Sequence, residues 1–219
     1  DEVPSRGLGD VYKRQKGDRV AAYVPNKIET IISFLACAKN GIIWSSCSPD
    51  FGAQGVVDRF KQIEPKVLIT SDYYFYNGKK INILDKVDEV LKQIPSIEKV
   101  IVYNYYKKEK ENLKNFIDFE ETLKIEKDES FERFEFNHPI YILFSSGTTG
   151  KPKCITHGTG NVLIEHNKEF MLHCDIRDNE KLFYYTTTGW MMWNWLVGGL
   201  ATGSSVSYTH LRAHETVLH

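Results

Sequence analysis

Short apolar segments alternate with amphipathic helical segments through the first half of the chain. The apolar segments occupy residues 19–24, 42–46, 66–70 and 99–103. Between them, apolar residues recur every three or four positions, which predicts helices with one buried face. Strands and helices in this order form a mostly parallel sheet covered by helices. The sequence therefore predicts an α/β fold, layered, with a largely parallel sheet.

The first expected helix follows Pro25 and has recognisable end signals. Asn26 is a residue type that caps helix N-termini, and Gly41 suits the left-handed residue that ends a helix. The apolar residues between them have helical spacing and are expected to form the buried face: Ile28, Ile31, Ile32, Leu35 and Ala38.

The second half of the chain is less regular. A stretch of mixed charge surrounds one expected short helix at residues 116–123, and it is interpreted as solvated surface. An apolar strand is then expected at 140–144, a helix at 161–173 and a strand at 182–186. An apolar helix starting at Trp190 completes the pattern.

Two segments near the ends are related as nucleic acid rather than as protein. A DNA sequence that encodes residues 6–15, RGLGDVYKRQ, has a reverse complement that encodes residues 206–214, VSYTHLRAH, in another frame. This relation is typical of a transposon-type sequencing adapter translated on both sides of an insert. We therefore expect residues 1–15 and 206–219 to be adapter-derived, and residues 16–205 to be a partial domain, open at both ends.

Composition excludes several classes of partner and site. With 28 Lys and Arg against 29 Asp and Glu, the net charge of −1 argues against a nucleic-acid surface or a polybasic membrane patch. The longest apolar stretch, residues 190–201, is too short to span a membrane. Four cysteines, at 37, 47, 154 and 174, lack metal-ligand spacing. They are interpreted as free thiols of a reducing compartment, the cytoplasm.

The loop at residues 145–153, SSGTTGKPK, follows directly after an apolar strand. It combines glycines, which let backbone N–H groups approach an anion, with hydroxyls and cations, and it contains no carboxylate. The spacing differs from a Walker A loop, and Pro152 favours a hairpin over a helix after the loop. The segment predicts a polyphosphate site, with these candidate residues: Ser145, Ser146, Gly147, Thr148, Thr149, Gly150, Lys151 and Lys153.

This loop resembles the signature loop of the adenylate-forming superfamily, which includes the acyl-CoA synthetases. Two further stretches, IWSSCSPDFG at 43–52 and YTTTGWMMWNWL at 185–196, are similar to the branch of that family that activates acetoacetate. The resemblance covers residues 16–205. It implies that the chain is part of the large N-terminal domain of the adenylate-forming fold.

The resemblance also implies an activity. An enzyme of this branch is a ligase that converts acetoacetate, ATP and CoA to acetoacetyl-CoA, AMP and pyrophosphate through an acyl-adenylate, with Mg²⁺ on the phosphates. It implies that Thr148, Thr149, Gly150 and Lys153 hold the β- and γ-phosphates. Trp190, Met191 and Met192 would line the acyl pocket. The catalytic Lys is expected outside this sequence, and the 219-residue chain alone is expected to be inactive.

Several alternatives stay open at this level. The parent enzyme could be another short-chain acyl-CoA synthetase, or the chain could be a non-catalytic nucleotide-phosphate-binding module. The loop could be a plain hairpin turn, and residues 190–196 could be a core helix. His157, His166 and His173 could contact ligands, although histidines in such positions are more often packing residues.

Overall fold

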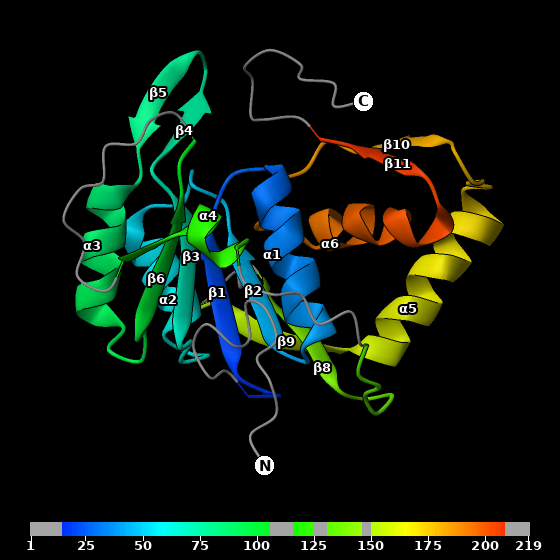
Figure 1. Ribbon diagram of the computed structural model, residues 1–219, viewed down its shortest axis with the longest axis horizontal. Coiled ribbons are helices and arrows are strands. Elements are labelled where there is room, and N and C mark those ends of the chain that lie inside the picture. Colours follow the sequence, from blue (N-terminus) through cyan, green and yellow to red (C-terminus); the bar gives the residue numbers. More distant parts are fainter. Residues whose placement is uncertain (1–14, 106–115, 125–130, 146–149, 209–219) are drawn as a thin grey trace.

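The computed structural model describes residues 15–105, 116–124, 131–145 and 150–208. A seven-stranded sheet forms its centre, with the strand order β7-β6-β3-β1-β2-β8-β9 (Figure 1). All neighbouring strands are parallel except β8 and β9, which are antiparallel. The predicted layered α/β fold is therefore confirmed. The strands of this sheet are β1 (Arg19–Tyr23), β2 (Ile43–Cys47), β3 (Val67–Ser71), β6 (Lys99–Tyr103), β7 (Phe116–Asp118), β8 (Pro139–Ser145) and β9 (Lys153–Gly158).

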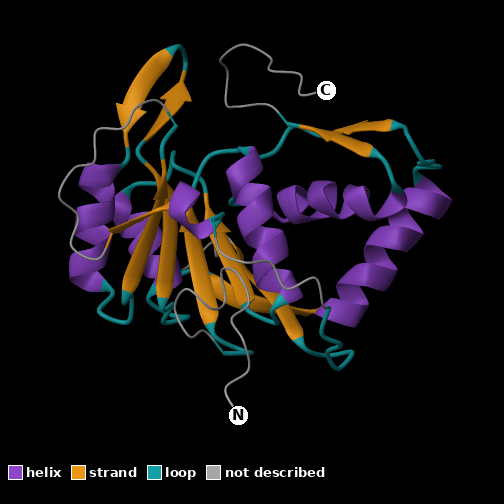
Figure 2. Cartoon of the chain, viewed as in Figure 1, coloured by secondary structure: helices purple, strands orange, loops and turns teal. Residues whose placement is uncertain are grey.

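Helices cover both faces of the sheet, as Figure 2 shows. They are α1 (Ile28–Lys39), α2 (Ala53–Phe60), α3 (Leu84–Gln93), α4 (Phe119–Thr122), α5 (Thr159–Lys168) and α6 (Met191–Gly198). A π-helical turn, Glu169–His173, extends α5, and a 3-10 turn, Gly199–Thr202, extends α6.

The alternation of side chains along each strand builds two cores. In β1, Ala21 and Tyr23 belong to one core, which α2 and α3 complete, whereas Val20 and Ala22 belong to the other. α1 and α6 contribute Phe34 and Trp193 to this second core. Because strand residues alternate between faces, a continuous apolar strand such as β1 is buried on both sides.

The buried face of α1 differs from the expected one. Ile28, Ile32 and Leu35 are 50%, 38% and 47% exposed, whereas Phe34 and Cys37 are buried. The helix also buries Thr30, whose hydroxyl donates to the carbonyl of Pro25 at 2.9 Å. Ile31 is buried as expected, whereas the prediction was wrong for Ile28, Ile32 and Leu35 because it counted only apolar residues. A small polar residue can face the sheet when it is hydrogen-bonded, and the aromatic ring of Phe34 then determines the rotation of the helix.

The expected N-cap of α1 is also wrong, whereas its C-terminal signal is confirmed. Lys27 occupies the N-cap position, and Asn26 instead donates from Nδ2 to the carbonyl of Thr186 at 2.8 Å. Asn26 thus joins segments far apart in the sequence, a role that local capping rules cannot reveal. Gly41 follows the C-cap with φ of 63°, as expected for a left-handed residue.

One small antiparallel hairpin was not expected. β4 (Tyr73–Tyr76) and β5 (Lys79–Asn82) form an antiparallel hairpin whose turn residues, Asn77 and Gly78, both have positive φ. An Asn-Gly pair between strand-forming residues is a strong hairpin signal, so the sequence did contain this information.

The expected helix at 116–123 begins with a strand, β7, before the short α4.

The last described strand crosses the expected adapter boundary. β11 (Ser205–Ser207) pairs in parallel with β10 (Lys181–Phe183). Val206 and Tyr208 pack against a third small core of Phe170, Leu182 and Leu196. Residues 206–208 therefore continue the fold, while the adapter origin of residues 1–15 and 206–219 stays a prediction.

The observed rotation of α1 predicts losses of stability of very different size for substitutions at two adjacent residues. Phe34→Ala should lower the free energy of unfolding by about 3–5 kcal/mol, because it removes a ring that is 6% exposed. Leu35→Ala should lower it by about 1 kcal/mol or less, because that side chain is 47% exposed. Urea unfolding of the two variants measures both values. A larger loss for Leu35→Ala would restore the face expected from sequence.

Candidate functional site

The loop expected to bind phosphates joins the two antiparallel strands β8 and β9. Ser145, the last residue of β8, pairs with Lys153, the first residue of β9. The predicted hairpin is therefore confirmed. Gly150 and Lys151 are exposed beside this end of the hairpin, as is Lys153. The remaining candidates, Ser146, Gly147, Thr148 and Thr149, lie outside the described residues.

Hydrogen bonds from neighbouring elements hold the hairpin in place. Gln62, just after α2, donates from Nε2 to the carbonyl of Pro152 at 2.8 Å. The Ser45 hydroxyl of β2 donates to the carbonyl of Ile142 in β8 at 2.8 Å. Sequence reasoning did not select Gln62. Its role depends on a contact between residues 90 positions apart.

The segment leading into α6 is fixed to the carboxyl ends of the central strands. The Thr188 hydroxyl donates to the carbonyl of Val24, after β1, at 2.7 Å. The Ser46 hydroxyl of β2 donates to the carbonyl of Thr188 at 2.6 Å. Trp190 occupies the N-cap position of α6. These bonds set where Met191 and Met192, the first residues of α6, lie relative to the sheet.

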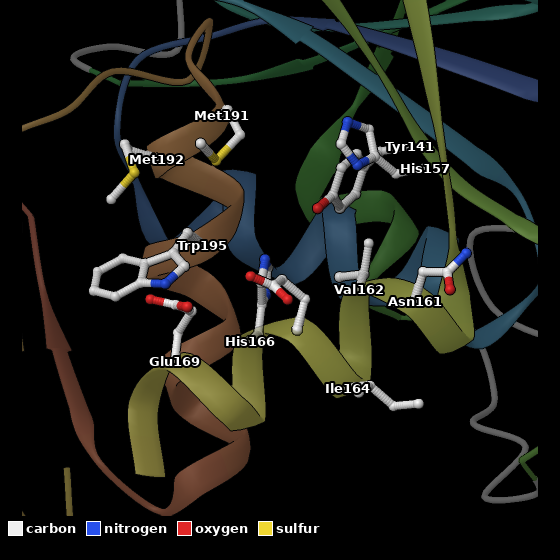
Figure 3. A pocket seen from close by; sticks show the side chains of 11 residues that line it. Tyr141, His157, Asn161, Val162, Ile164, His166, Glu169, Met191, Met192 and Trp195 are labelled. Carbon is white, nitrogen blue, oxygen red and sulfur yellow. The ribbon is translucent and has the colours of Figure 1, made fainter. Parts of the chain in front are cut away.

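A cavity of about 820 Å³ opens beside these methionines (Figure 3). It lies between α6, α5 and the hairpin β8–β9, and its lining residues are Tyr141, His157, Asn161, Val162, Ile164, Glu165, His166, Glu169, Met191, Met192 and Trp195. Two of the three acyl-pocket candidates, Met191 and Met192, are therefore in its wall. Trp190 does not line it and is 58% exposed.

The hairpin connects this cavity to the phosphate loop. Tyr141 of β8 and His157 of β9 are paired in register and contribute to the cavity wall. Ser145 and Lys153 are paired four residues further along. At the usual rise of a strand, the loop end is about 13 Å from the cavity. One rigid element thus carries both candidate sites.

Two of the three histidines singled out from the sequence line the cavity. Burial lowers the pKa of His157, whose ring centroid lies 4.9 Å from that of Tyr141. Burial also lowers the pKa of His166. The nearby Glu165 acts in the opposite direction and raises this pKa, whereas His157 lowers it further. His173, in contrast, is 59% exposed beyond the end of α5. At neutral pH, the two cavity histidines are therefore neutral.

A close crossing of α5 and α6 shapes one side of the cavity. A Cβ atom placed on Gly198 of α6 would lie 2.3 Å from Nδ1 of His166. Since real Cβ atoms do not approach other atoms so closely, glycine is required for His166 to occupy its position. Phe170 packs on the same imidazole with its centroid 6.1 Å away.

The described residues form neither a metal site nor a membrane-spanning helix. Within the described part of the chain, no group of three His, Cys, Asp or Glu side chains is arranged to hold a metal ion. None of the helices described is both long and apolar enough to cross a bilayer. All four cysteines are free thiols; Cys37 and Cys47 are buried, and Cys154 and Cys174 are exposed.

Comparison with known proteins identifies the family. Residues 10–217 match the family model described as AMP-binding enzyme. The chain belongs to the AMP-binding enzyme family. This assignment agrees with the resemblance carried by the loop at 145–153.

The names of individual relatives are more specific than the description of the family. The chain is 50% identical to an acetoacetyl-coenzyme A synthetase of Rhizobium meliloti over 87% of the chain and 30% of the relative. It is 42% identical to a malonamoyl-CoA synthetase of Penicillium aethiopicum over 89% of the chain. The solved acetoacetyl-CoA synthetase of Streptomyces lividans matches 90% of the chain with a TM-score of 0.83 and 42% identity. The chain spans about 30% of that structure, and the expected adenylate-forming fold is confirmed.

Apart from His166, sequence reasoning missed the α5 side of the cavity. Its lining residues include Asn161, Val162, Glu165, His166 and Glu169. These residues are one, three or four positions apart, so they lie on one face of a helix. This spacing is visible in the sequence. Nothing in α5 alone indicates that this face meets α6 rather than solvent, because that depends on how the two helices cross.

The lowered histidine pKa values predict how stability depends on pH. Both pKa values lie below the ordinary 6.5, so unfolding in mildly acidic solution allows these side chains to bind protons that the folded state binds less readily. We expect the free energy of unfolding to decrease as the pH falls below about 6.5. The decrease between about pH 7.5 and pH 5.5 should be smaller in His166→Gln. Urea unfolding at both pH values measures the effect, and an unchanged decrease in the variant would contradict it.

Proposed function

We propose that the whole protein is an ATP-dependent acid–thiol ligase that converts acetoacetate to acetoacetyl-CoA. In the first step, the acid carboxylate attacks the α-phosphorus of ATP, giving the acyl-adenylate and releasing pyrophosphate. In the second, the CoA thiol attacks the acyl carbon, and AMP leaves. The observation that supports this most directly is the 50% identity to an acetoacetyl-coenzyme A synthetase over 87% of the chain. Because the chain spans about 30% of that relative, the activity belongs to a longer protein, and the 219-residue chain alone does not turn over.

Within this proposal, the residues of the hairpin loop bind the ATP phosphates. These residues are Ser145, Ser146, Gly147, Thr148, Thr149, Gly150, Lys151 and Lys153. Hydroxyl and backbone donors stabilise the charge of the leaving pyrophosphate, and the exposed Lys151 and Lys153 add positive charge. Mg²⁺ accompanies the nucleotide, since phosphate oxygens and water supply most of its ligands in such enzymes.

The cavity beside Met191 and Met192 is proposed to receive the acyl group. Its volume of about 820 Å³ is large enough for a small acid and the start of the pantetheine arm of CoA. The methionine thioethers and Trp195 form an apolar wall. The names of the relatives specify acetoacetyl and malonamoyl groups, and both have a carbonyl at carbon 3. A short acid with a polar tail is therefore the proposed substrate class.

The proposal includes domain limits and a compartment. Residues 16–205 are the native part of the domain, with adapter-derived residues 1–15 and 206–219. The four free thiols support a reducing compartment, the cytoplasm. The small-molecule partners are acetoacetate, ATP and CoA. A ligase specific for a different short acid is the second candidate, supported by the malonamoyl-CoA synthetase relative.

The loop assignment is tested in the full-length enzyme by replacing Thr148 and Thr149 together with Val. We expect acetoacetate-dependent pyrophosphate exchange to slow by about two to three decades, because contacts with a charged leaving group are lost in a site protected from water. Thr156→Val, on the exposed side of β9, is the matched control and should leave the rate unchanged. A rate of the double variant within threefold of the control would exclude the loop from phosphate binding.

The acyl-pocket assignment is tested by Met192→Ala in the full-length enzyme. Shortening this side chain enlarges the cavity, so kcat/KM for hexanoate should rise relative to acetoacetate, while KM for ATP stays within about threefold. Met171→Ala is the control, because Met171 is 56% exposed and does not line the cavity. If acid preference is unchanged and only stability falls, residues 190–196 are a core helix and not a pocket wall.

A further inference from the structure

A second cavity, of about 380 Å³, opens between α1, α5 and α6, the three helices on the right of Figure 1. Tyr141, Val162 and His166 separate it from the candidate acyl pocket, since they line both. Among the described residues that line this second cavity, none is Asp, Glu, Lys or Arg. We call it the helix groove. Solvated surface is rich in charged residues, so the composition of the groove is typical of surface that another part of a protein covers.

The rim of the helix groove is apolar and exposed. Leu35 of α1, Leu163 of α5 and Leu200 after α6 are 47%, 56% and 40% exposed. Along α1, the apolar surface continues to Ile32 and Ile28, which are 38% and 50% exposed. Residues at positions 28, 32 and 35 lie on one face of a helix, and an apolar face of this kind is usually buried. A continuous apolar surface marks a site of contact with protein.

The floor of the helix groove contains a buried amide without a partner. Asn194 of α6 lines the groove and is 2% exposed. Within the described part of the chain, neither its Nδ2 nor its Oδ1 has a hydrogen-bond partner. Because buried polar side chains are nearly always hydrogen-bonded, we expect the partner of this amide in whatever fills the groove.

The chemistry of the amide indicates what kind of partner it has. The side chain of Asn194 offers an N–H donor beside a carbonyl acceptor. In an extended segment, one residue directs its own N–H and C=O to the same side, as in the pairs that exchange two hydrogen bonds across a sheet. A backbone of this kind satisfies both amide atoms. A purely apolar ligand leaves the amide unpaired, and a charged ligand meets no opposite charge among the described lining residues.

The whole protein contains enough further polypeptide to supply such a segment. The chain spans about 30% of the length of its relatives, so most of such a protein lies outside these 219 residues. A segment of the same polypeptide is held near the groove at a high effective concentration, whereas a second molecule must be captured from solution.

We propose that, in the whole protein, an extended segment from outside this chain lies in the helix groove and pairs its backbone N–H and C=O with the Asn194 amide. Its apolar side chains contact Leu35, Leu163 and Leu200 on the rim. The groove is thus an internal interface that joins α1, α5 and α6 to the rest of the protein. This inference does not depend on which acid the enzyme activates.

The cover is tested by cysteine labelling of the full-length protein. Leu35→Cys places a thiol on the rim, and peptide mass spectrometry follows its reaction with a maleimide. In the native protein without ligands, this reaction should be more than about tenfold slower than in urea, because the covering segment must first open. Slowing of less than tenfold overturns the inference. Protection that is lost on dilution to the monomer, or that requires added ATP, CoA or acetoacetate, also overturns it, because a second copy or a small ligand is then the cover.

The pairing of the amide is tested by adding Asn194→Leu to the Leu35→Cys protein. If a backbone pairs with this amide, the change leaves buried backbone groups without partners. Labelling at position 35 should then become about tenfold faster, and the urea midpoint should fall. Asn167→Leu is the matched control, because Asn167 also lines the groove but donates from Nδ2 to the carbonyl of Leu163 in its own helix at 2.7 Å. It should change the labelling rate less than threefold.

An unchanged labelling rate and an unchanged or higher urea midpoint in Asn194→Leu overturn the pairing, since replacing an unpaired buried amide with an apolar side chain stabilises a protein. If Asn194→Leu does not fold, the labelling of Leu35→Cys alone decides whether the groove is covered. Both measurements are independent of catalysis, so their failure leaves the proposed function intact.

Discussion

The packing of Trp193 on Trp44 holds the candidate acyl site against the sheet. The two indoles are stacked with centroids 6.4 Å apart and an angle of 17° between their planes. Phe34 of α1 contacts both rings edge-on at 5.8 Å. Because Trp44 belongs to β2 and Trp193 to α6, this aromatic cluster fixes α6 on the sheet and places Met191 and Met192 at the cavity. Aromatic side chains are suited to this role because they bury a large area in a defined geometry.

The aromatic cluster also connects the proposed acyl pocket to the loop proposed to bind ATP phosphates. Tyr141 packs against Phe34 with centroids 6.2 Å apart, so the aromatic cluster extends into β8. β8 and β9 then carry the loop proposed to bind ATP phosphates, and α5 follows β9 without an intervening loop. A movement of this hairpin would change the distance between loop and cavity by little, since both are built on it. The arrangement suits a reaction in which an acid must be held in line with the α-phosphorus of ATP.

Much of the fold could be predicted from the sequence. The four apolar runs in the first half became β1, β2, β3 and β6 within one residue at each end, because buried parallel strands are continuously apolar and easily recognised. The loop at 145–153 and its return strand could be predicted for a similar reason, since Pro152 and the glycines restrict the local backbone. The rotation of α1 could not. Ile28, Ile32 and Leu35 fit an amphipathic pattern, yet they are partly exposed, because Phe34 packs into the aromatic cluster.

The sequence by itself determined most of the elements, the signature loop and the family, since these depend on residues close together in the chain. The tertiary structure decided which side chains meet. Tyr141 and His166 are 25 positions apart and belong to a strand and a helix; neither belongs to a recognisable motif. They face one cavity because Gly198 lets α5 approach α6 closely and because the aromatic cluster fixes α6 on the sheet. Which side chains share the cavity wall is a property of that assembled space, and local sequence patterns do not encode it.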